Sequence, residues 1–172
     1  MSRKSEILRY LGYKKIAPRE DIDNAIDRIE KEVEAVAVPR TVKAEVCASS
    51  LLWKSNTVEK ALHGCKKAVI FAATLGAGVD RLIMQKECSN ISEAVIAQAV
   101  AAALIEEVCD KLQSEYSSYP RVSPGYGDFP LSAQKDILKM LETGTKIGLS
   151  MTEAMMLVPT KSVTAIFAVK ES

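Results

Sequence analysis

A chain of 172 residues, 48% of them hydrophobic, is long enough for one domain with a substantial core. Its 23 Lys and Arg against 22 Asp and Glu give a net charge of +1. This near balance argues against a basic surface that binds nucleic-acid phosphates and against a polybasic membrane anchor. The sequence shows neither an apolar run of the roughly 20 residues that span a bilayer nor a signal peptide, so we expect a cytoplasmic protein.

Two helices are predicted in the N-terminal part of the chain. Residues 3–12 have the pattern of a short helix that ends at Gly12. Residues 19–37 have the pattern of a long amphipathic helix that ends before Pro39, with acidic residues in its first turn. Its apolar residues recur at intervals of three and four: Ile22, Ile26, Ile29, Val33 and Val36.

Strands and helices alternate in the middle of the chain. Residues 41–47 alternate apolar and polar side chains like a half-buried strand. Residues 67–74 form a continuous apolar run that is typical of a central, fully buried strand. Helices are predicted over 57–63, over about 79–86 and over the alanine-rich stretch 91–116.

Prolines and glycines indicate where regular structure stops in the last third of the chain. Three prolines and two glycines between residues 119 and 130 predict a loop. A helix is predicted over 132–141 with Ser132 as its N-cap. The last two strands, 153–158 and 162–169, are predicted to pair as a hairpin.

This irregular order of elements predicts the α+β class, with a mixed, largely antiparallel sheet and packed helices. No internal repeat or low-complexity segment divides the sequence. We expect residues 1–172 to form a single domain, in which residues 1–38 are an N-terminal helical arm.

Metal binding and nucleophilic catalysis find little support in the sequence. The cysteines lack metal-ligand spacing, and the one histidine, His63, lies near a predicted helix end with no nucleophile-elbow sequence in the chain. We therefore expect no metal site and no catalytic residue. The cysteines are predicted to be small buried hydrophobic residues: Cys47, Cys65, Cys88 and Cys109.

The sequence Gly76-x-Gly78 lies between a predicted strand and a predicted helix, as in dinucleotide-binding motifs. Arg81 stands where that motif has its third glycine. A tight turn that needs glycine is therefore favoured over a nucleotide phosphate site.

Two neighbouring glutamates lie on the predicted helix 91–116. Glu106 and Glu107 are about 100° apart around a helix, so they cannot act as a carboxylate pair on one substrate atom. Glu106 lies opposite the apolar stripe, where we expect it to be solvated. Glu107 lies at the edge of the stripe, where it can either reach a ligand or form a surface pair with Lys111.

The loop from residue 121 carries side chains suited to ligand binding. Arg121 has a planar guanidinium that matches a carboxylate with two hydrogen bonds. Pro124 and Gly125 fix a turn, and Gly125 allows the backbone to approach a ligand closely. Tyr126 projects a rigid ring suited to a flat ligand. A plain structural loop with a surface arginine is the alternative.

Two stretches resemble a known family. Arg121-Val122-Ser123-Pro124-Gly125-Tyr126 resembles the R-x-x-P-G-Y signature of the activation domain of cobalamin-dependent methionine synthase. Residues 149–164 resemble the L-T-E-S-x-A-M-x-P-x-x-S-V-S segment of that domain, and residues 7–13 are similar to the start of short, free-standing members. The matching positions in the second stretch are Thr152, Glu153, Met156, Pro159, Ser162 and Val163.

The resemblance implies the activation-domain fold and an accessory role rather than independent catalysis. Such a domain binds S-adenosylmethionine and docks over a cobalamin domain. A flavodoxin-like donor reduces the inactive Co(II) form, and the methyl group of S-adenosylmethionine then traps Co(I) as methylcobalamin. The sequence contains no Asp-x-His-x-x-Gly segment, so we expect the cobalamin to be carried by a partner protein.

The resemblance also implies roles for individual residues. Arg121 would pair with the ligand carboxylate, and the backbone of Val122, Ser123 and Gly125 would line the adenosine. Tyr126 would lie near the methyl group and the corrin, and Glu107 would help to hold the ligand. Neither an early acidic ligand residue of the family nor the tyrosine-bearing segment that follows in fused enzymes can be placed in this sequence.

Three other functions remain open at the level of sequence. The chain can reactivate another corrinoid methyltransferase instead of methionine synthase. It can be an independent S-adenosylmethionine-dependent methyltransferase, although no catalytic base is evident. It can also be a scaffold protein that keeps the fold without the ligand.

Overall fold

The computed structural model describes residues 2–13, 18–51, 53–116 and 118–170. Its helices are α1 (Arg3–Tyr10), α2 (Glu20–Val36), α3 (Asn56–Leu62), α4 (Ala77–Ser89), α5 (Ile91–Gln113), α6 (Ala133–Leu141) and α7 (Thr143–Ile147), with a 3₁₀ turn η1 (Ala48–Ser50). Its strands are β1 (Arg40–Cys47), β2 (Lys67–Thr74), β3 (Ser150–Met151), β4 (Leu157–Val158) and β5 (Ser162–Ala168).

β2 lies at the centre of a three-stranded antiparallel sheet with the order β1-β2-β5. Arg40 of β1 lies opposite Thr74, and Ala168 of β5 lies opposite Ala68. All residues of β2 after Lys67 are buried. The continuous apolar run therefore forms the central strand that the sequence predicts, and the predicted strand over 41–47 is confirmed as β1.

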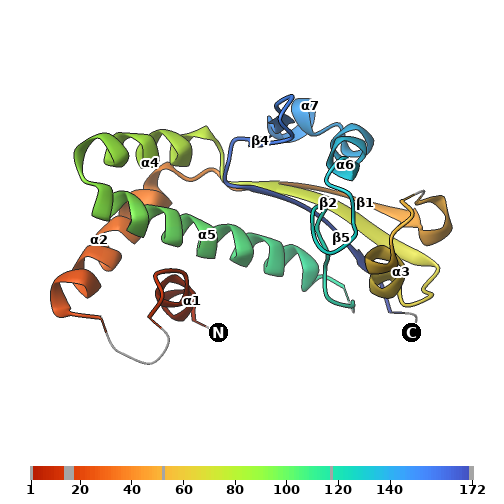
Figure 1. The fold of residues 1–172 in the computed structure, drawn as a ribbon, viewed down its shortest axis with the longest axis horizontal. Coiled ribbons are helices and arrows are strands. Elements are labelled where there is room, and N and C mark those ends of the chain that lie inside the picture. The colour runs from red at the N-terminus through yellow and green to blue at the C-terminus, as the bar shows by residue number, and fades with distance from the viewer. Residues whose placement is uncertain (1, 14–17, 52, 117, 171–172) are drawn as a thin grey trace.

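Helices cover both faces of this sheet. Figure 1 shows α5 running along one face and α6 and α7 lying over the other. Phe71 and Phe167 belong to the core cluster on the α5 side, whereas Ile70 and Ile166 belong to the cluster on the α6 side. This alternation follows from the two-residue period of a strand.

Among the described residues, no helix is long and apolar enough to cross a membrane.

The two N-terminal helices pack on α5. Lys4 of α1 forms ion pairs with Asp23 at 2.9 Å and Asp27 at 2.8 Å on α2. Residues 1 and 14–17 of the predicted helical arm lie outside the described residues. The fully buried apolar residues of the two helices are Ile7, Ile26, Ile29 and Val33.

The predicted hairpin of 153–158 with 162–169 is wrong. β4 pairs with β3, where Ser150 lies opposite Val158, and β5 pairs with β2. Residues 164–168 are all buried, so this strand gains most from a place between two helical layers. Residues 152–156 are exposed and form the turn of the small β3–β4 ribbon instead.

The starts of α4 and α6 test two local predictions. Gly76 has φ +83 immediately before α4, and a side chain at Gly78 would collide with the Val36 carbonyl of α2. Gly76 therefore serves a tight turn, as expected, whereas Gly78 serves a close contact with α2 that the sequence did not predict. Ser132 occupies the N-cap position of α6, as predicted, but it has helical dihedral angles and its side chain makes no capping hydrogen bond.

Candidate functional site

The loop between α5 and α6 is joined to β5 by backbone hydrogen bonds. Val122 and Ile166 each donate an N–H to the other's carbonyl oxygen at 2.9 Å. The N–H of Tyr119 donates to the Ala168 carbonyl at 3.0 Å. Because β5 is an edge strand, the loop covers part of its free edge and holds Arg121 beside the last turns of α5.

Arg121 contacts three side chains of α5. Its guanidinium donates to the carboxylates of Glu106 at 2.6 Å and Asp110 at 2.7 Å, and to the side-chain oxygen of Gln113 at 2.9 Å. Burial alone would lower the pKa of Arg121, but hydrogen bonds to Asp110 and Glu106 outweigh it and raise the pKa. The expectation that Glu106 is simply solvated is wrong, because the returning loop brings Arg121 onto it.

The turn that presents Tyr126 is closed by backbone hydrogen bonds. Gly125 has φ +88, and its N–H donates to the Phe129 carbonyl at 2.8 Å. Tyr126 N–H donates to the Ser123 carbonyl at 3.2 Å. Phe129 is buried beneath the turn, whereas Tyr126 is 69% exposed. The prediction of a fixed turn with a projecting tyrosine ring is confirmed.

Asp128 fastens the same loop to the start of α3. Its carboxylate accepts hydrogen bonds from the Ser55 hydroxyl at 2.7 Å, the Asn56 N–H at 2.8 Å and the Thr57 N–H at 2.9 Å. Hydrogen bonds from Thr57, Ser55 and Asn56 stabilise the charged form and hold the pKa of Asp128 well below its usual range. The loop therefore has a second attachment, to the start of α3, in addition to its backbone hydrogen bonds with β5.

Glu107 lies on a different side of α5 from Arg121. Its carboxylate accepts a hydrogen bond from Arg3 of α1 at 2.6 Å, and this contact lowers the pKa of Glu107. Arg3 also forms an ion pair with Glu30 at 3.0 Å and one with Glu34. The ion pair of Glu107 is therefore with Arg3 rather than with Lys111, the surface partner that its position on the helix suggested.

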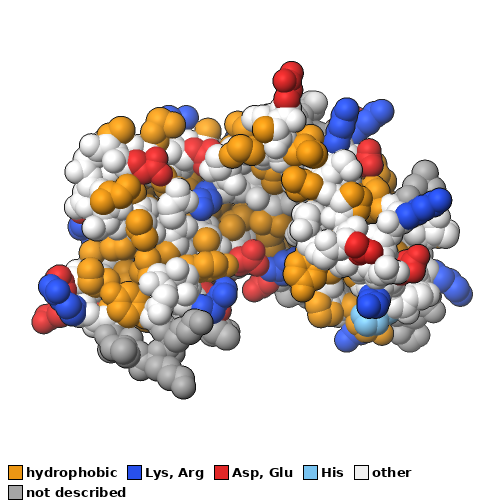
Figure 2. Space-filling model, in the orientation of Figure 1, with side chains coloured by type: hydrophobic (Ala, Val, Ile, Leu, Met, Phe, Trp, Pro, Cys, Tyr) orange, Lys and Arg blue, Asp and Glu red, His pale blue; other side chains and the backbone are white. Residues whose placement is uncertain are grey.

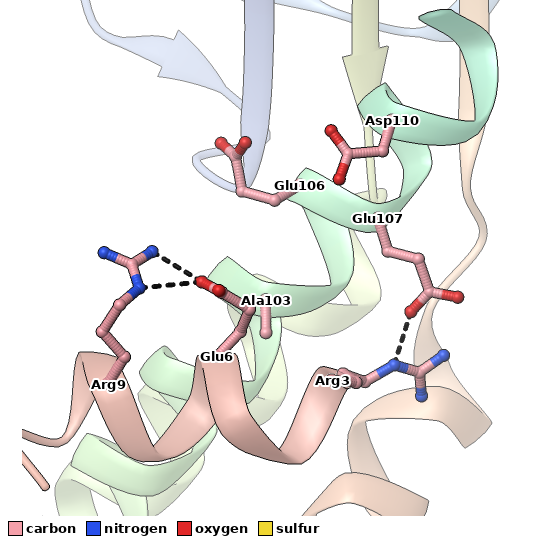
Figure 3. Close-up of a pocket in the computed structure, with 7 residues that line it drawn as sticks. All are labelled: Arg3, Glu6, Arg9, Ala103, Glu106, Glu107 and Asp110. Atoms are coloured by element: carbon pink, nitrogen blue, oxygen red, sulfur yellow. Dashed lines mark hydrogen bonds and ion pairs between the residues drawn. The ribbon is translucent and has the colours of Figure 1, made fainter. Parts of the chain in front are cut away.

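A pocket of about 540 Å³ opens between α1 and α5 beside this cluster. Figure 3 shows Glu106 and Asp110 on one wall and Arg9 paired with Glu6 on the other. The remaining lining residues are Arg3, Ala103 and Glu107. The α1 residues escaped the sequence analysis because their contact with α5 joins segments about a hundred residues apart, which no local pattern reveals.

Beyond the loop, the edge of β5 has no backbone partner among the described residues at Thr164, a residue that is only 3% exposed. Alternate residues of an antiparallel strand direct their backbone groups to opposite sides. Because Ile166 bonds outward to Val122, the N–H and C=O of Thr164 also point outward, and no described residue forms a backbone hydrogen bond with them. Figure 2 shows a hollow with hydrophobic side chains in its depth between the α4–α5 side of the molecule and the α6 side.

The second family-like stretch connects α6 and α4. Gln134 of α6 donates to the Met155 carbonyl in the β3–β4 ribbon at 3.0 Å. The backbone N–H and the hydroxyl of Thr160 both donate to Asp80 of α4, each at 2.7 Å. The stretch therefore fixes the start of β5, next to its open edge.

The cysteines differ from one another in exposure. Cys109 is buried, and burial raises the pKa of its thiol to about 12. Cys47 and Cys88 are exposed and Cys65 is partly buried, so the prediction of four buried cysteines is wrong.

His63 is the C-cap of α3, as expected for a helix end. The described residues contain no group of three or more His, Cys, Asp or Glu that could hold a metal ion.

Comparison with known proteins identifies the fold. No protein-family model and no curated protein sequence matches the chain. Among solved structures it is similar to the crystal structure of the MetH reactivation domain bound to AdoHcy, with a TM-score of 0.67 over 98% of this chain and 74% of that chain. The sequences are 17% identical, so the likeness shows a common fold. It confirms the predicted α+β fold of the methionine synthase activation-domain type.

Proposed function

We propose that this protein is an S-adenosylmethionine-binding accessory module that acts in trans in the reductive methylation of cobalamin on a methionine synthase. The observation that carries the proposal is the position of Arg121. It lies between Glu106 and Asp110 on the fold of a reactivation domain that was solved with AdoHcy. The signature-like sequence around Arg121 forms an ordered, doubly attached loop, as a binding element requires.

The charges around Arg121 suit the amino-acid end of S-adenosylmethionine. The ligand carboxylate would take hydrogen bonds from Arg121, while its ammonium would lie against Glu106 and Asp110. Two carboxylates and one guanidinium leave this cluster with an excess negative charge. S-adenosylmethionine carries a net positive charge, so the cluster favours it electrostatically.

The adenosine would lie along the loop and the open edge of β5. The backbone of Val122, Ser123 and Gly125 would line it, and the outward backbone groups of Thr164 supply a donor and an acceptor for a heterocycle. Glu107, which is paired with Arg3, would support the ligand from the α1 side. Tyr126 would face the partner, since its ring is exposed at the tip of the loop.

The residues of this chain would bind and orient the methyl donor. Cobalamin on the partner would supply the cobalt that accepts the methyl group, after reduction by a flavodoxin-like donor. Arg121 and the loop would fix the donor's amino-acid end and ribose, and Tyr126 would help to exclude water above the methyl group. The partner is a cobalamin-binding methionine synthase or another corrinoid methyltransferase.

Calorimetric titration of S-adenosylmethionine tests the proposal, first with the protein alone and then with a cobalamin-loaded partner. We expect binding that Arg121→Ala weakens by about 2–4 kcal/mol, as for loss of one member of a desolvated charge pair. Arg28→Ala is the matched control, because Arg28 pairs with Glu32 of its own helix and with Glu93 in the first turn of α5, away from the end of α5 that contacts Arg121. An absence of binding in both titrations would leave a scaffold protein that keeps only the fold.

A further inference from the structure

The other edge of the sheet, formed by β1, has no strand partner among the described residues. Even-numbered residues of β1 bond to β2, because the ladder continues with the Ala48 N–H donating to the Lys66 carbonyl at 2.8 Å. The backbone groups of residues 41, 43, 45 and 47 therefore point away from the sheet. These four residues are exposed, and no described residue forms a backbone–backbone hydrogen bond with them. The Cys47 carbonyl accepts a hydrogen bond from the Ser50 hydroxyl at 2.6 Å and keeps a second lone pair for a strand partner. An edge of this kind can accept another strand.

A groove of about 360 Å³ runs beside this edge on the α5 side. Its floor is apolar and consists of Leu104, Val108 and Leu112 of α5, with Thr41 of β1 on its wall. Thr41, Lys43 and Glu45 face the α5 side, since they lie opposite β2 residues that belong to the α5 cluster. A strand added to β1 would cover this groove with its own alternate side chains.

The β1 sequence is complementary to itself in one antiparallel register. When Ala44 lies opposite Ala44 of a second copy, Lys43 lies opposite Glu45 of that copy, and the reverse pair forms by symmetry. Val42 then lies opposite Val46, a favourable β-branched pair, and the small Ala44 side chains meet at the two-fold axis. The outward backbone groups of 41, 43, 45 and 47 match in this register, so about eight hydrogen bonds form, two for each of four pairs.

Neighbouring registers are disfavoured by charge. The two nearest registers that also match the outward backbone groups place Lys43 opposite Lys43, or Glu45 opposite Glu45. Like charges directly opposite each other in a strand pair are destabilising. The alternation of Lys43 and Glu45 therefore selects one symmetric pairing and identifies the occupant of the edge as a second copy of this chain.

We propose that two copies of this protein associate through β1 and form a continuous six-stranded antiparallel sheet with the order β5-β2-β1-β1-β2-β5. The contact is isologous and closed by a two-fold axis, so it gives a dimer rather than a fibre. Arg121 and the free part of the β5 edge lie at the opposite edge of each sheet, so both copies keep these parts of the candidate ligand site accessible. Glu107 differs, because it also lines the groove beside β1.

Analytical ultracentrifugation of charge variants tests this interface. Lys43 also forms an ion pair with Glu115 in its own chain, so the variants are made in a Glu115→Gln background. Lys43→Glu and Glu45→Lys should each raise the dimer dissociation constant at least about 10-fold, because each creates two like-charge pairs. The double variant restores both pairs and should recover to within about 3-fold of the background protein. Glu87→Lys changes an exposed residue of α4 and is the control, so it should leave the dimer dissociation constant unchanged.

Disulfide cross-linking tests the register independently of affinity. Ala44 faces its own copy in a non-hydrogen-bonded pair, where Cα atoms are about 4.5 Å apart, within disulfide range. Ala44→Cys should therefore give a covalent dimer on oxidation. Glu45→Cys should not, because each new cysteine faces Lys43. A protein that sediments as a monomer at several hundred micromolar overturns the proposal, as does a dimer that ignores both charge reversals.

Discussion

Arg121 and Glu106 form a 2.6 Å ion pair that joins the α5–α6 loop to the C-terminal part of α5, the longest helix in the described part of the chain. The pair couples two functions of the loop. It neutralises a guanidinium that is only 19% exposed, and it places a carboxylate next to the arginine proposed to bind the ligand. The carboxylate of bound S-adenosylmethionine would replace Glu106 as one hydrogen-bond partner of Arg121. The ligand ammonium would then pair with the carboxylate of Glu106.

Replacement of Glu106 by Gln tests this exchange. Glu106→Gln should weaken S-adenosylmethionine binding by about 1.5–3 kcal/mol, the range for a hydrogen bond to a charged group. The affinity for 5′-methylthioadenosine should not change, because this compound lacks the amino-acid end. Titration calorimetry with both compounds gives the comparison. An equal loss for both would show that Glu106 acts on the loop rather than on the ligand's amino acid.

Tyr126 is expected to affect reactivation and not stability. Its side chain is largely exposed at the tip of a turn that backbone hydrogen bonds close without it. Tyr126→Phe and Tyr126→Ala should therefore change the free energy of unfolding by less than about 0.5 kcal/mol. Tyr126→Phe should also bind S-adenosylmethionine almost as well as the original protein. Reactivation of a cobalamin-loaded partner should fall in Tyr126→Ala, and unchanged rates would remove Tyr126 from the partner interface.

Asp128 should make the loop's attachment to α3 depend on pH. Its pKa is lowered in the folded protein, so its contribution to stability is present above the unfolded pKa of about 3.9. That contribution is lost as the pH falls from about 4 towards the lower folded-state pKa. Asp128→Asn should therefore lower the melting temperature at pH 7, and the gap between variant and original should narrow below about pH 4. A gap that stays constant with pH would mean that the charge of Asp128 contributes nothing.

Local periodicity was sufficient for most of the fold but not for its pairing. The run 67–74 is apolar on both faces, and only a strand between two helical layers buries it completely. The same reasoning applies to residues 164–168, yet their partner is β2, about ninety residues away in the chain, and not the adjacent β4. Sequence proximity favours a hairpin, whereas burial decides the pairing.

The candidate site shows the same division between local and long-range information. The turn at Gly125 and the exposed ring of Tyr126 follow from residue types within a few positions. The contacts of Arg121 with Glu106 and Asp110 and of Glu107 with Arg3 depend on how α1, α5 and the loop pack. No periodic signal in the sequence encodes them, because ion pairs between separate elements leave no spacing pattern.

Gly78 tests whether the Gly76-x-Gly78 sequence serves packing. A Cβ at Gly78 would collide with the backbone carbonyl of Val36, which cannot rotate away, so α4 and α2 would have to separate. Gly78→Ala should therefore destabilise the protein by about 1–3 kcal/mol, the usual cost of overpacking. Gly144→Ala in α7 is the matched control, because a Cβ there meets nothing within 4 Å, and alanine should be neutral or stabilise by up to about 1 kcal/mol. Urea denaturation of both variants measures the two values. A Gly78→Ala protein as stable as the original would return the glycine pair to consideration as a ligand-binding turn.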